Sequence, residues 1–382
     1  MKLCCVGIGL GLLTFACSGR YDVGFEPAGG SAGKASQNAA GTAASSGGSS
    51  SVGGTGSGTA GGSVIGEGGV GDNDVPVDMG RCGFSPTAKS APATAVASSA
   101  ELATRVYHFL DASEAPSDLM LPRTPSAAWA ATLATQILDG HAAAQTEAPG
   151  LVRFLASWLP GNADHPTADS AHAWGLKLTA ADATLATLLS EPTGEAHRFG
   201  ILTEVDVLSA KNGISARGTW MVKALFCTDV PPPPPNLPEA DPAPQPGMTQ
   251  REVLEASVAN PACNACHALF DPSGDSLEHF DDAGNYRVLD NGEPVDASAR
   301  MASPPLEFQD FESLAPQLAV SCQVAQCIGG SIFQDALNAG LGSGAVTLSE
   351  SERNAVANQF ANADFSIRAL VQAIVTSPSF VR

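Results

Sequence analysis

The sequence has few basic residues. Lys and Arg together number 19, against 39 Asp and Glu, which gives a formal net charge of −20 at pH 7. This balance argues against nucleic acid or anionic lipid as a direct partner, because both attract clustered positive charge. The simplest interpretation of the acidity is that it keeps the protein soluble.

Long hydrophobic runs are also missing. The mostly apolar run from Val6 to Ala16 is shorter than the roughly 18 residues that a membrane span requires, and no second span is expected. With Lys2 before it and Cys17 after it, residues 1–17 have the form of an export signal and resemble a bacterial lipoprotein signal. We expect export, lipidation of Cys17, and a lipid-anchored mature chain at the outer membrane, in the periplasm or at the cell surface.

Large apolar side chains are nearly absent from residues 18–80, which are dominated by Gly, Ser, Ala and Thr. Such a segment cannot bury enough surface to offset the entropy of ordering it. We therefore predict a disordered tether behind the anchor.

Strand-like alternation is scarce in the remaining chain, whereas helical periodicity and capping signals recur. We expect a mostly α-helical protein, with one helix from Thr124 to Gly140 and others that begin at the Thr249–Glu252 and Ser349–Glu352 pairs. A proline-rich stretch predicts a stiff connector. The expected organisation is a helical bundle domain at 97–228, a connector at 229–248 and a second helical region at 249–382.

Several catalytic motifs are missing. The chain has no phosphate-binding glycine loop, no G-x-S-x-G, and no carboxylate pair that can be assigned to a cleft. We expect no hydrolase or nucleotide chemistry. Whether the protein is an enzyme stays open.

What the sequence does contain is Cys263-x-x-Cys266-His267. This spacing is typical of covalent haem c, in which two cysteines form thioethers and the histidine binds iron. A zinc site requires a second ligand pair, which is missing, and a thioredoxin-like dithiol requires a βαβ context. The remaining alternative is a structural disulfide between Cys263 and Cys266 in a haem-free protein.

The residues around this motif resemble a family of exported, planctomycete-type cytochrome-like proteins built from consecutive domains of unknown function. The resemblance covers nearly everything after residue 97, and its most specific part is the signature that begins NPACNACH and ends GNYR. The signature positions are Asn260, Pro261, Cys263, Cys266, His267, Asp271, Pro272, Gly274, Leu277, Glu278, Phe280, Asp281, Gly284, Tyr286 and Arg287. The resemblance implies that the helical region at 249–382 is cytochrome-c-like and that the exported protein has a haem c domain. It does not imply a reaction or substrate.

If haem is bound, His267 is the proximal ligand and the second axial ligand is open. Met301, in a Ser/Ala/Pro-rich loop, and His279 are the candidates, and an open iron face would instead permit catalysis. Arg287 is a candidate partner for a haem propionate, or it forms a salt bridge with a nearby aspartate.

Four further cysteines, Cys82, Cys227, Cys322 and Cys327, predict two disulfides in an oxidising compartment. On one continuous helix Cys322 and Cys327 point to different faces. We therefore expect either a helix break at Gly329-Gly330 or pairing of one of them with Cys227.

The sequence thus predicts an exported, lipid-anchored haem c protein that transfers electrons to or from an unknown redox partner. Two alternatives remain: a haem-free surface lipoprotein that acts as a binding module, and a haem enzyme with an open distal site.

Overall fold

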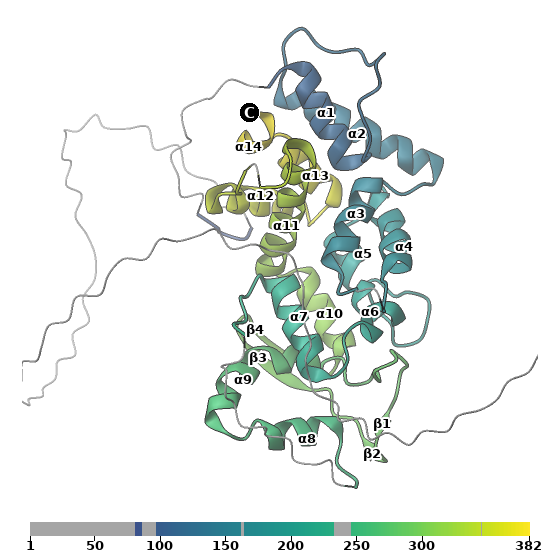
Figure 1. Ribbon diagram of the computed structural model, residues 1–382, viewed down its shortest axis with the longest axis vertical. Helices are drawn as coiled ribbons and strands as arrows, with labels where there is room; N and C mark the ends of the chain where they lie inside the picture. The colour runs from purple at the N-terminus through teal and green to yellow at the C-terminus, as the bar shows by residue number, and fades with distance from the viewer. Residues whose placement is uncertain (1–80, 86–96, 162–163, 233–245, 345) are drawn as a thin grey trace, which may run out of the picture. The chain divides into compact units, whose positions relative to one another are not determined.

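The computed structural model describes residues 81–85, 97–161, 164–232, 246–344 and 346–382 (Figure 1). These residues lie within one compact unit, Asp72–Arg382. The predicted signal at 1–17, Cys17 and the tether at 18–80 lie outside the described residues.

The described chain is mostly helical, so the predicted fold class is confirmed. The first group of helices is α1 (Ser99–Leu110), α2 (Ala127–Ala144), α3 (Pro149–Trp158), α4 (Ala168–Thr179), α5 (Leu185–Leu189), the 3₁₀ helix η1 (Ile201–Thr203), α6 (Val205–Ser209) and α7 (Ile214–Phe226). After the proline-rich segment come α8 (Gln250–Ser257), α9 (Pro261–Asp275), α10 (Phe311–Ala319), α11 (Cys322–Leu341), α12 (Glu350–Asn362), α13 (Ile367–Val375) and α14 (Pro378–Val381). The strands are β1 (Leu289–Asp290), β2 (Glu293–Pro294), β3 (Ala299–Ala302) and β4 (Pro305–Phe308).

Capping side chains start the helices where polar residues precede an apolar stripe. The predicted starts of α8 and α12 are confirmed: Thr249 accepts a hydrogen bond from the backbone of Glu252, and Ser349 does the same for Glu352. The predicted limits of α2 are wrong, because Ser126 is its N-cap and the helix continues through Gly140 to Ala144.

The helix break expected at Gly329-Gly330 is also wrong. Helix α11 runs without interruption from Cys322 to Leu341, and both glycines are buried in it. The missing side chains instead allow close approach, since a Cβ on Gly330 would lie 2.9 Å from the side chain of Arg353.

Helices from both sides of the proline-rich segment pack together. Helix α11 contacts α1, α7 and α12, and α13 contacts α2 (Figure 1). Their shared apolar core includes Phe109, Trp174, Phe333 and Phe360, each completely buried. The two-domain division at residues 229–248 stays a prediction.

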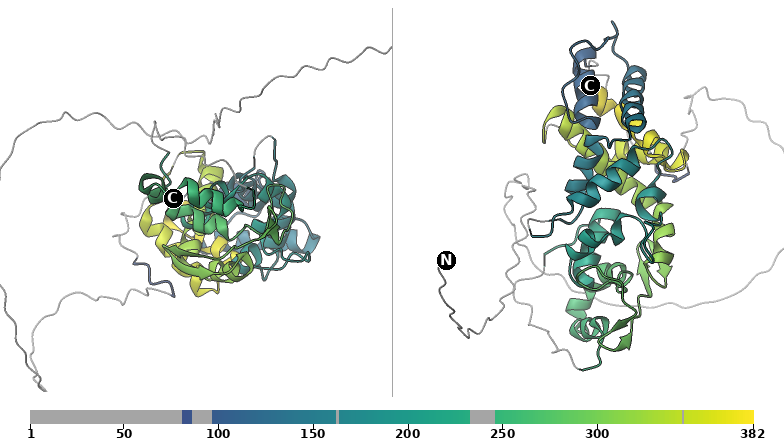
Figure 2. Two further views of the ribbon diagram at one scale, coloured as in Figure 1. Left: turned by 90° about the horizontal axis from the view of Figure 1, so that it is seen from below. Right: turned by 90° about the vertical axis from the view of Figure 1, so that its right-hand side faces the viewer.

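Two short antiparallel hairpins interrupt the helical pattern. Strand β1 pairs with β2, and β3 pairs with β4 in a register that places Met301 opposite Leu306. They lie at the same end of the described structure as α8 and α9 (Figures 1 and 2), where β3 packs against α9. Met301 is therefore a strand residue with a buried side chain, and the loop predicted around it is wrong.

The four remaining described cysteines form two disulfides, as predicted. Cys82 pairs with Cys322, and Cys227 pairs with Cys327. Of the two arrangements expected for Cys322 and Cys327, the structure has the one in which one of them pairs with Cys227. The second disulfide joins the C-terminus of α7 to α11 across the proline-rich segment. None of the helices in the described ranges is long and apolar enough to cross a membrane.

Candidate functional site

The candidate site is built on a close crossing of α7 and α9. A Cβ added to Gly218 would lie 2.1 Å from the carbonyl oxygen of Phe270, and one added to Gly274 would lie 2.0 Å from that of Ile214. Only glycine fits at both positions, so the two backbones are in direct contact. This contact positions the side chains that precede each glycine on its helix.

Helix α9 presents the C-x-x-C-H motif in its first two turns. Asn260 caps the helix by accepting a hydrogen bond from the backbone of Ala262 at 3.0 Å, and Pro261 occupies the first helical position. Cys263 and Cys266 are both free thiols, half-buried and exposed respectively. Because they are three residues apart on one helix, they lie on the same side of it.

The imidazole of His267 is anchored through one ring nitrogen. Its Nδ1 lies 2.8 Å from Oδ2 of Asp271, one turn further along α9, and 3.4 Å from Oγ of Ser215 on α7. The hydroxyl of Ser215 donates to the other carboxylate oxygen of Asp271 at 2.7 Å. Burial raises the pKa of Asp271, against the hydrogen bonds from Ser215 and His267 that lower it.

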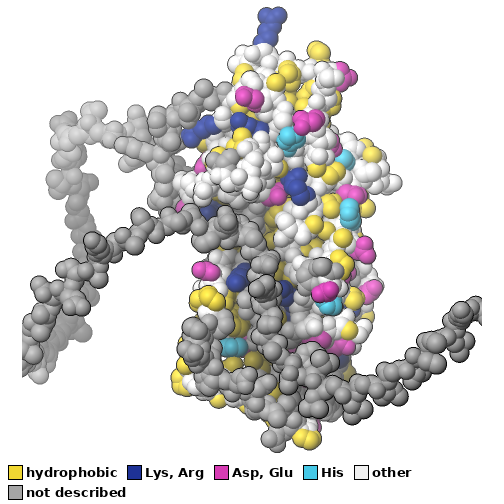
Figure 3. Space-filling view, viewed as in Figure 1, with side chains coloured by type: hydrophobic (Ala, Val, Ile, Leu, Met, Phe, Trp, Pro, Cys, Tyr) yellow, Lys and Arg dark blue, Asp and Glu magenta, His cyan; other side chains and the backbone are white. Residues whose placement is uncertain are grey.

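The segment that carries the motif has no fully buried residue before Phe270. From Pro246 to Leu269, a range that contains all of α8 and the first half of α9, every side chain is exposed or half-buried. Apolar side chains are among them, including Val253, Leu254 and Leu269. Figure 3 shows hydrophobic side chains on the surface in the region where Figure 1 labels α9. Helix α8 has no fully buried residue, and an eight-residue helix is marginal alone.

Two buried carboxyl groups follow the motif. Burial raises the pKa of Asp275 to about 7, although Arg251 lies 3.9 Å away and lowers it. Burial also raises the pKa of Glu278 to about 7, against the opposing charges of Arg287 and Arg217.

The chain that leaves α9 is held by Arg217. This side chain is 2% exposed and donates to the carbonyl oxygens of Lys211, Phe280 and Asp281 at 3.0, 2.6 and 2.5 Å. A buried guanidinium whose donors are satisfied by carbonyl oxygens connects the loop before α7 to the segment after α9.

Arg287, a candidate for a haem propionate, is already paired. Its guanidinium contacts Oε2 of Glu278 at 3.1 Å and Oδ1 of Asp290 at 2.5 Å. In the structure Arg287 therefore forms salt bridges, as the alternative to a propionate contact predicted, and its partner Glu278 is almost completely buried. Much of the family signature after His267 thus has a folding role: Glu278 and Arg287 pair, and Asp281 accepts backbone hydrogen bonds in the turn at Gly284.

The two candidates for the second axial ligand have other partners. Met301 packs in the apolar core, at 3% exposure. The Nδ1 of His279 lies 3.0 Å from the carbonyl oxygen of Arg287, and its ring stacks on Tyr286. No described hydrogen bond or ring contact joins either residue to His267, so their assignment stays a prediction.

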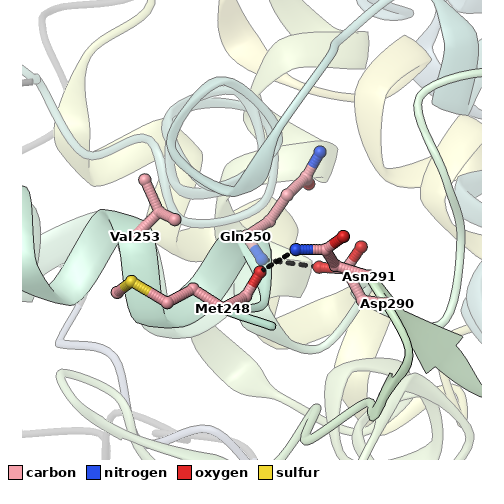
Figure 4. Close-up of a pocket in the computed structure, with 5 residues that line it drawn as sticks. All are labelled: Met248, Gln250, Val253, Asp290 and Asn291. Carbon is pink, nitrogen blue, oxygen red and sulfur yellow. Dashed lines mark hydrogen bonds between the residues drawn. The ribbon is translucent and has the colours of Figure 1, made fainter. Parts of the chain in front are cut away.

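A pocket of about 420 Å³ lies beside the start of α8 (Figure 4). The side chain of Asn291 donates to the carbonyl oxygen of Met248, and the backbone of Gln250 donates to Asp290. Asp290 also pairs with Arg287, so the pocket's one carboxylate is engaged. Within the described ranges, no group of three or more His, Cys, Asp and Glu is arranged to hold a metal ion.

Sequence reasoning identified the two cysteines and His267 but gave Ser215, Gly218, Gly274 and Arg217 no role. The contact of Asp271 with His267 could have been predicted, because a residue four positions further along a helix lies one turn away. Ser215 could not, since only the α7–α9 crossing brings it to the site.

No curated protein and no solved structure matches the chain. A family model does match residues 198–290, which include the whole signature from Asn260 to Arg287 and the α7–α9 crossing. The resemblance expected outside this range stays a prediction. The matching family is PSCyt3, protein of unknown function (DUF1588), a planctomycete cytochrome-like domain, and residues 198–290 are similar to it.

Proposed function

We propose that this protein binds one covalent haem c through Cys263, Cys266 and His267 and transfers single electrons to and from an unknown partner. The observation that carries the proposal is the arrangement on α9: two free thiols on one side of the helix, with a histidine beside them. The match of residues 198–290 to a cytochrome-like family supports it.

The donor set and its surroundings fit the group. Thioether attachment needs two accessible thiols, and Cys263 and Cys266 are the described cysteines outside disulfides. Iron ligation needs one free imidazole nitrogen, and the anchoring of His267 through Nδ1 leaves Nε2 for it. Leu269, two residues after His267, has an exposed apolar side chain that a large apolar ring can contact.

When bound, haem supplies a one-electron redox centre whose potential depends on its axial ligands and their hydrogen bonds. The protein's own contribution is to hold the two cysteines on one helical face and to orient His267. A disulfide between Cys263 and Cys266 is the competing proposal, and both residues are thiols here while four others are paired.

The test is a pyridine haemochrome spectrum together with intact mass, on the full chain exported by a host that matures c-type cytochromes. We expect a c-type spectrum and the added mass of one haem. The double substitution Cys263→Ala and Cys266→Ala removes both, whereas Ala265→Ser, on the same exposed part of α9, leaves both unchanged.

A colourless protein of unmodified mass would refute the haem proposal. Thiol titration then separates a Cys263–Cys266 disulfide, and with it a haem-free binding module, from two free thiols. If haem is bound, a high-spin spectrum indicates an open iron face and catalysis, and a low-spin spectrum indicates electron transfer.

We also propose that the protein is exported and anchored to a membrane by lipid on Cys17. This proposal rests on residues 1–17 of the sequence alone. We expect fatty-acid labelling of the full chain in a bacterial host and its loss on Cys17→Ser. Labelling that persists in the variant would refute the anchor site.

A further inference from the structure

The carboxylate that contacts His267 is itself held from the neighbouring helix. Asp271 is 8% exposed, and its two carboxylate oxygens have different partners: Oδ2 contacts Nδ1 of His267 at 2.8 Å, and Oδ1 accepts from Ser215 at 2.7 Å. The chain from Ser215 through Asp271 to His267 therefore joins α7 to α9 beside the two free thiols.

This contact determines where the neutral imidazole carries its proton. An ionised carboxylate only accepts hydrogen bonds, so the ring nitrogen that faces it is the protonated one. With Nδ1 protonated, Nε2 has the lone pair that binds a metal. A carboxylate on the other nitrogen of a metal-binding histidine also makes the ring a stronger donor to the metal.

We propose that Asp271, held by Ser215, is the positioning residue of His267: it keeps the proton on Nδ1 and strengthens Nε2 as a donor, which stabilises oxidised iron. The strengthening of Nε2 toward iron rests on the proposed haem function. The position of the proton does not, because it is a property of the chain without haem.

The first experiment measures the histidine tautomer by ¹⁵N NMR, on the full chain produced without haem maturation. We expect His267 to be protonated mainly on Nδ1. Asp271→Ala should shift the ring toward protonation on Nε2, and Asp271→Asn, whose amide oxygen can still accept from Nδ1, should restore the original tautomer. His267 protonated mainly on Nε2 in the parent chain, or no change in Asp271→Ala, would overturn the positioning role.

The second experiment measures the midpoint potential of the matured haem protein. Asp271→Asn keeps an acceptor but removes the negative charge, so we expect the ratio of reduced to oxidised protein at fixed potential to rise about tenfold, or about 59 mV for one electron. Ser215→Ala should shift the ratio in the same direction by less.

Asp275→Asn is the matched control. Asp275 is a carboxyl on the same helix with similar burial, 7% exposed, and its ion-pair partner is Arg251. We expect its substitution to shift the potential several-fold less than Asp271→Asn. Equal shifts in the two variants would overturn the specific role of Asp271, since they would reflect only lost negative charge near the haem.

The two proposals fail separately. A matured protein without haem overturns the proposed function and, with it, the effect of Asp271 on iron. The NMR measurement still decides whether Asp271 positions His267. A haem protein whose potential does not respond to Asp271→Asn retains the proposed function and overturns the inference.

Discussion

Substituting Gly218 by alanine tests the helix crossing on which the site is built. The new Cβ would lie 2.1 Å from the carbonyl oxygen of Phe270 and 3.2 Å from the backbone nitrogen of Gly274. Relief requires α7 and α9 to separate by about 1 Å, because the neighbouring atoms are backbone and cannot rotate away. The separation stretches the 2.7 Å hydrogen bond between Ser215 and Asp271 beyond hydrogen-bonding distance.

The expected magnitude follows from two opposing terms. Alanine in a helix interior is favoured over glycine by about 0.5–1 kcal/mol, whereas overpacking costs about 1–3 kcal/mol. We therefore expect Gly218→Ala to lower the free energy of unfolding by about 1–2 kcal/mol, measured by denaturant titration of circular dichroism. Gly274→Ala overpacks the same crossing, and a separation of the helices that relieves one clash also relieves the other. The double variant should therefore lose less than the sum of the single variants.

Gly140→Ala is the control, because this residue lies in the interior of α2 with no heavy atom within 4 Å of the added Cβ. We expect it to raise the free energy of unfolding by up to about 1 kcal/mol. If Gly218→Ala behaves like this control, the two backbones are not in direct contact and the crossing does not position Ser215 beside Asp271.

Three further predictions concern stability. Burial raises the pKa of both Asp275 and Glu278 to about 7, so the folded state binds their protons more tightly than the unfolded state. The contribution of these protons to the free energy of unfolding is fully present below the pKa of the unfolded state. It is lost as pH rises through about 7. Denaturant titrations across this range should show stability falling as pH rises, and Asp275→Asn should flatten the fall, whereas an unchanged slope would contradict the burial of this carboxyl. Replacing Cys227 and Cys327 together by serine opens a loop of 100 residues. We expect thermal unfolding to show that the free energy of unfolding falls by about 2–5 kcal/mol. An unchanged free energy would mean that the disulfide does not form. Arg217→Met leaves buried carbonyl oxygens without donors, and denaturant titrations should show that it lowers the free energy of unfolding by about 3 kcal/mol or more. A loss below about 1 kcal/mol would contradict the role of Arg217 in holding the segment after α9.

The sequence alone determined the fold class, several helix starts and the candidate haem attachment residues. These are local properties: a capping threonine or serine three residues before a glutamate, or two cysteines and a histidine within five positions, act within one or two helical turns. Helix geometry separates the faces of Cys322 and Cys327, and it left two arrangements open: a helix break at Gly329-Gly330, or pairing of one of the two cysteines with Cys227.

Only the tertiary structure decided what surrounds the motif. Ser215 precedes Asp271 by 56 positions, and Gly218 and Gly274 have no meaning as a contact until α7 and α9 cross. Arg287 pairs with Glu278 and Asp290 because the turn after α9 folds back on itself, which no local pattern predicts. Helix periodicity specifies which face of each helix is apolar, but the partner of that face depends on long-range packing. The absence of fully buried residues from Pro246 to Leu269 is a result of that packing.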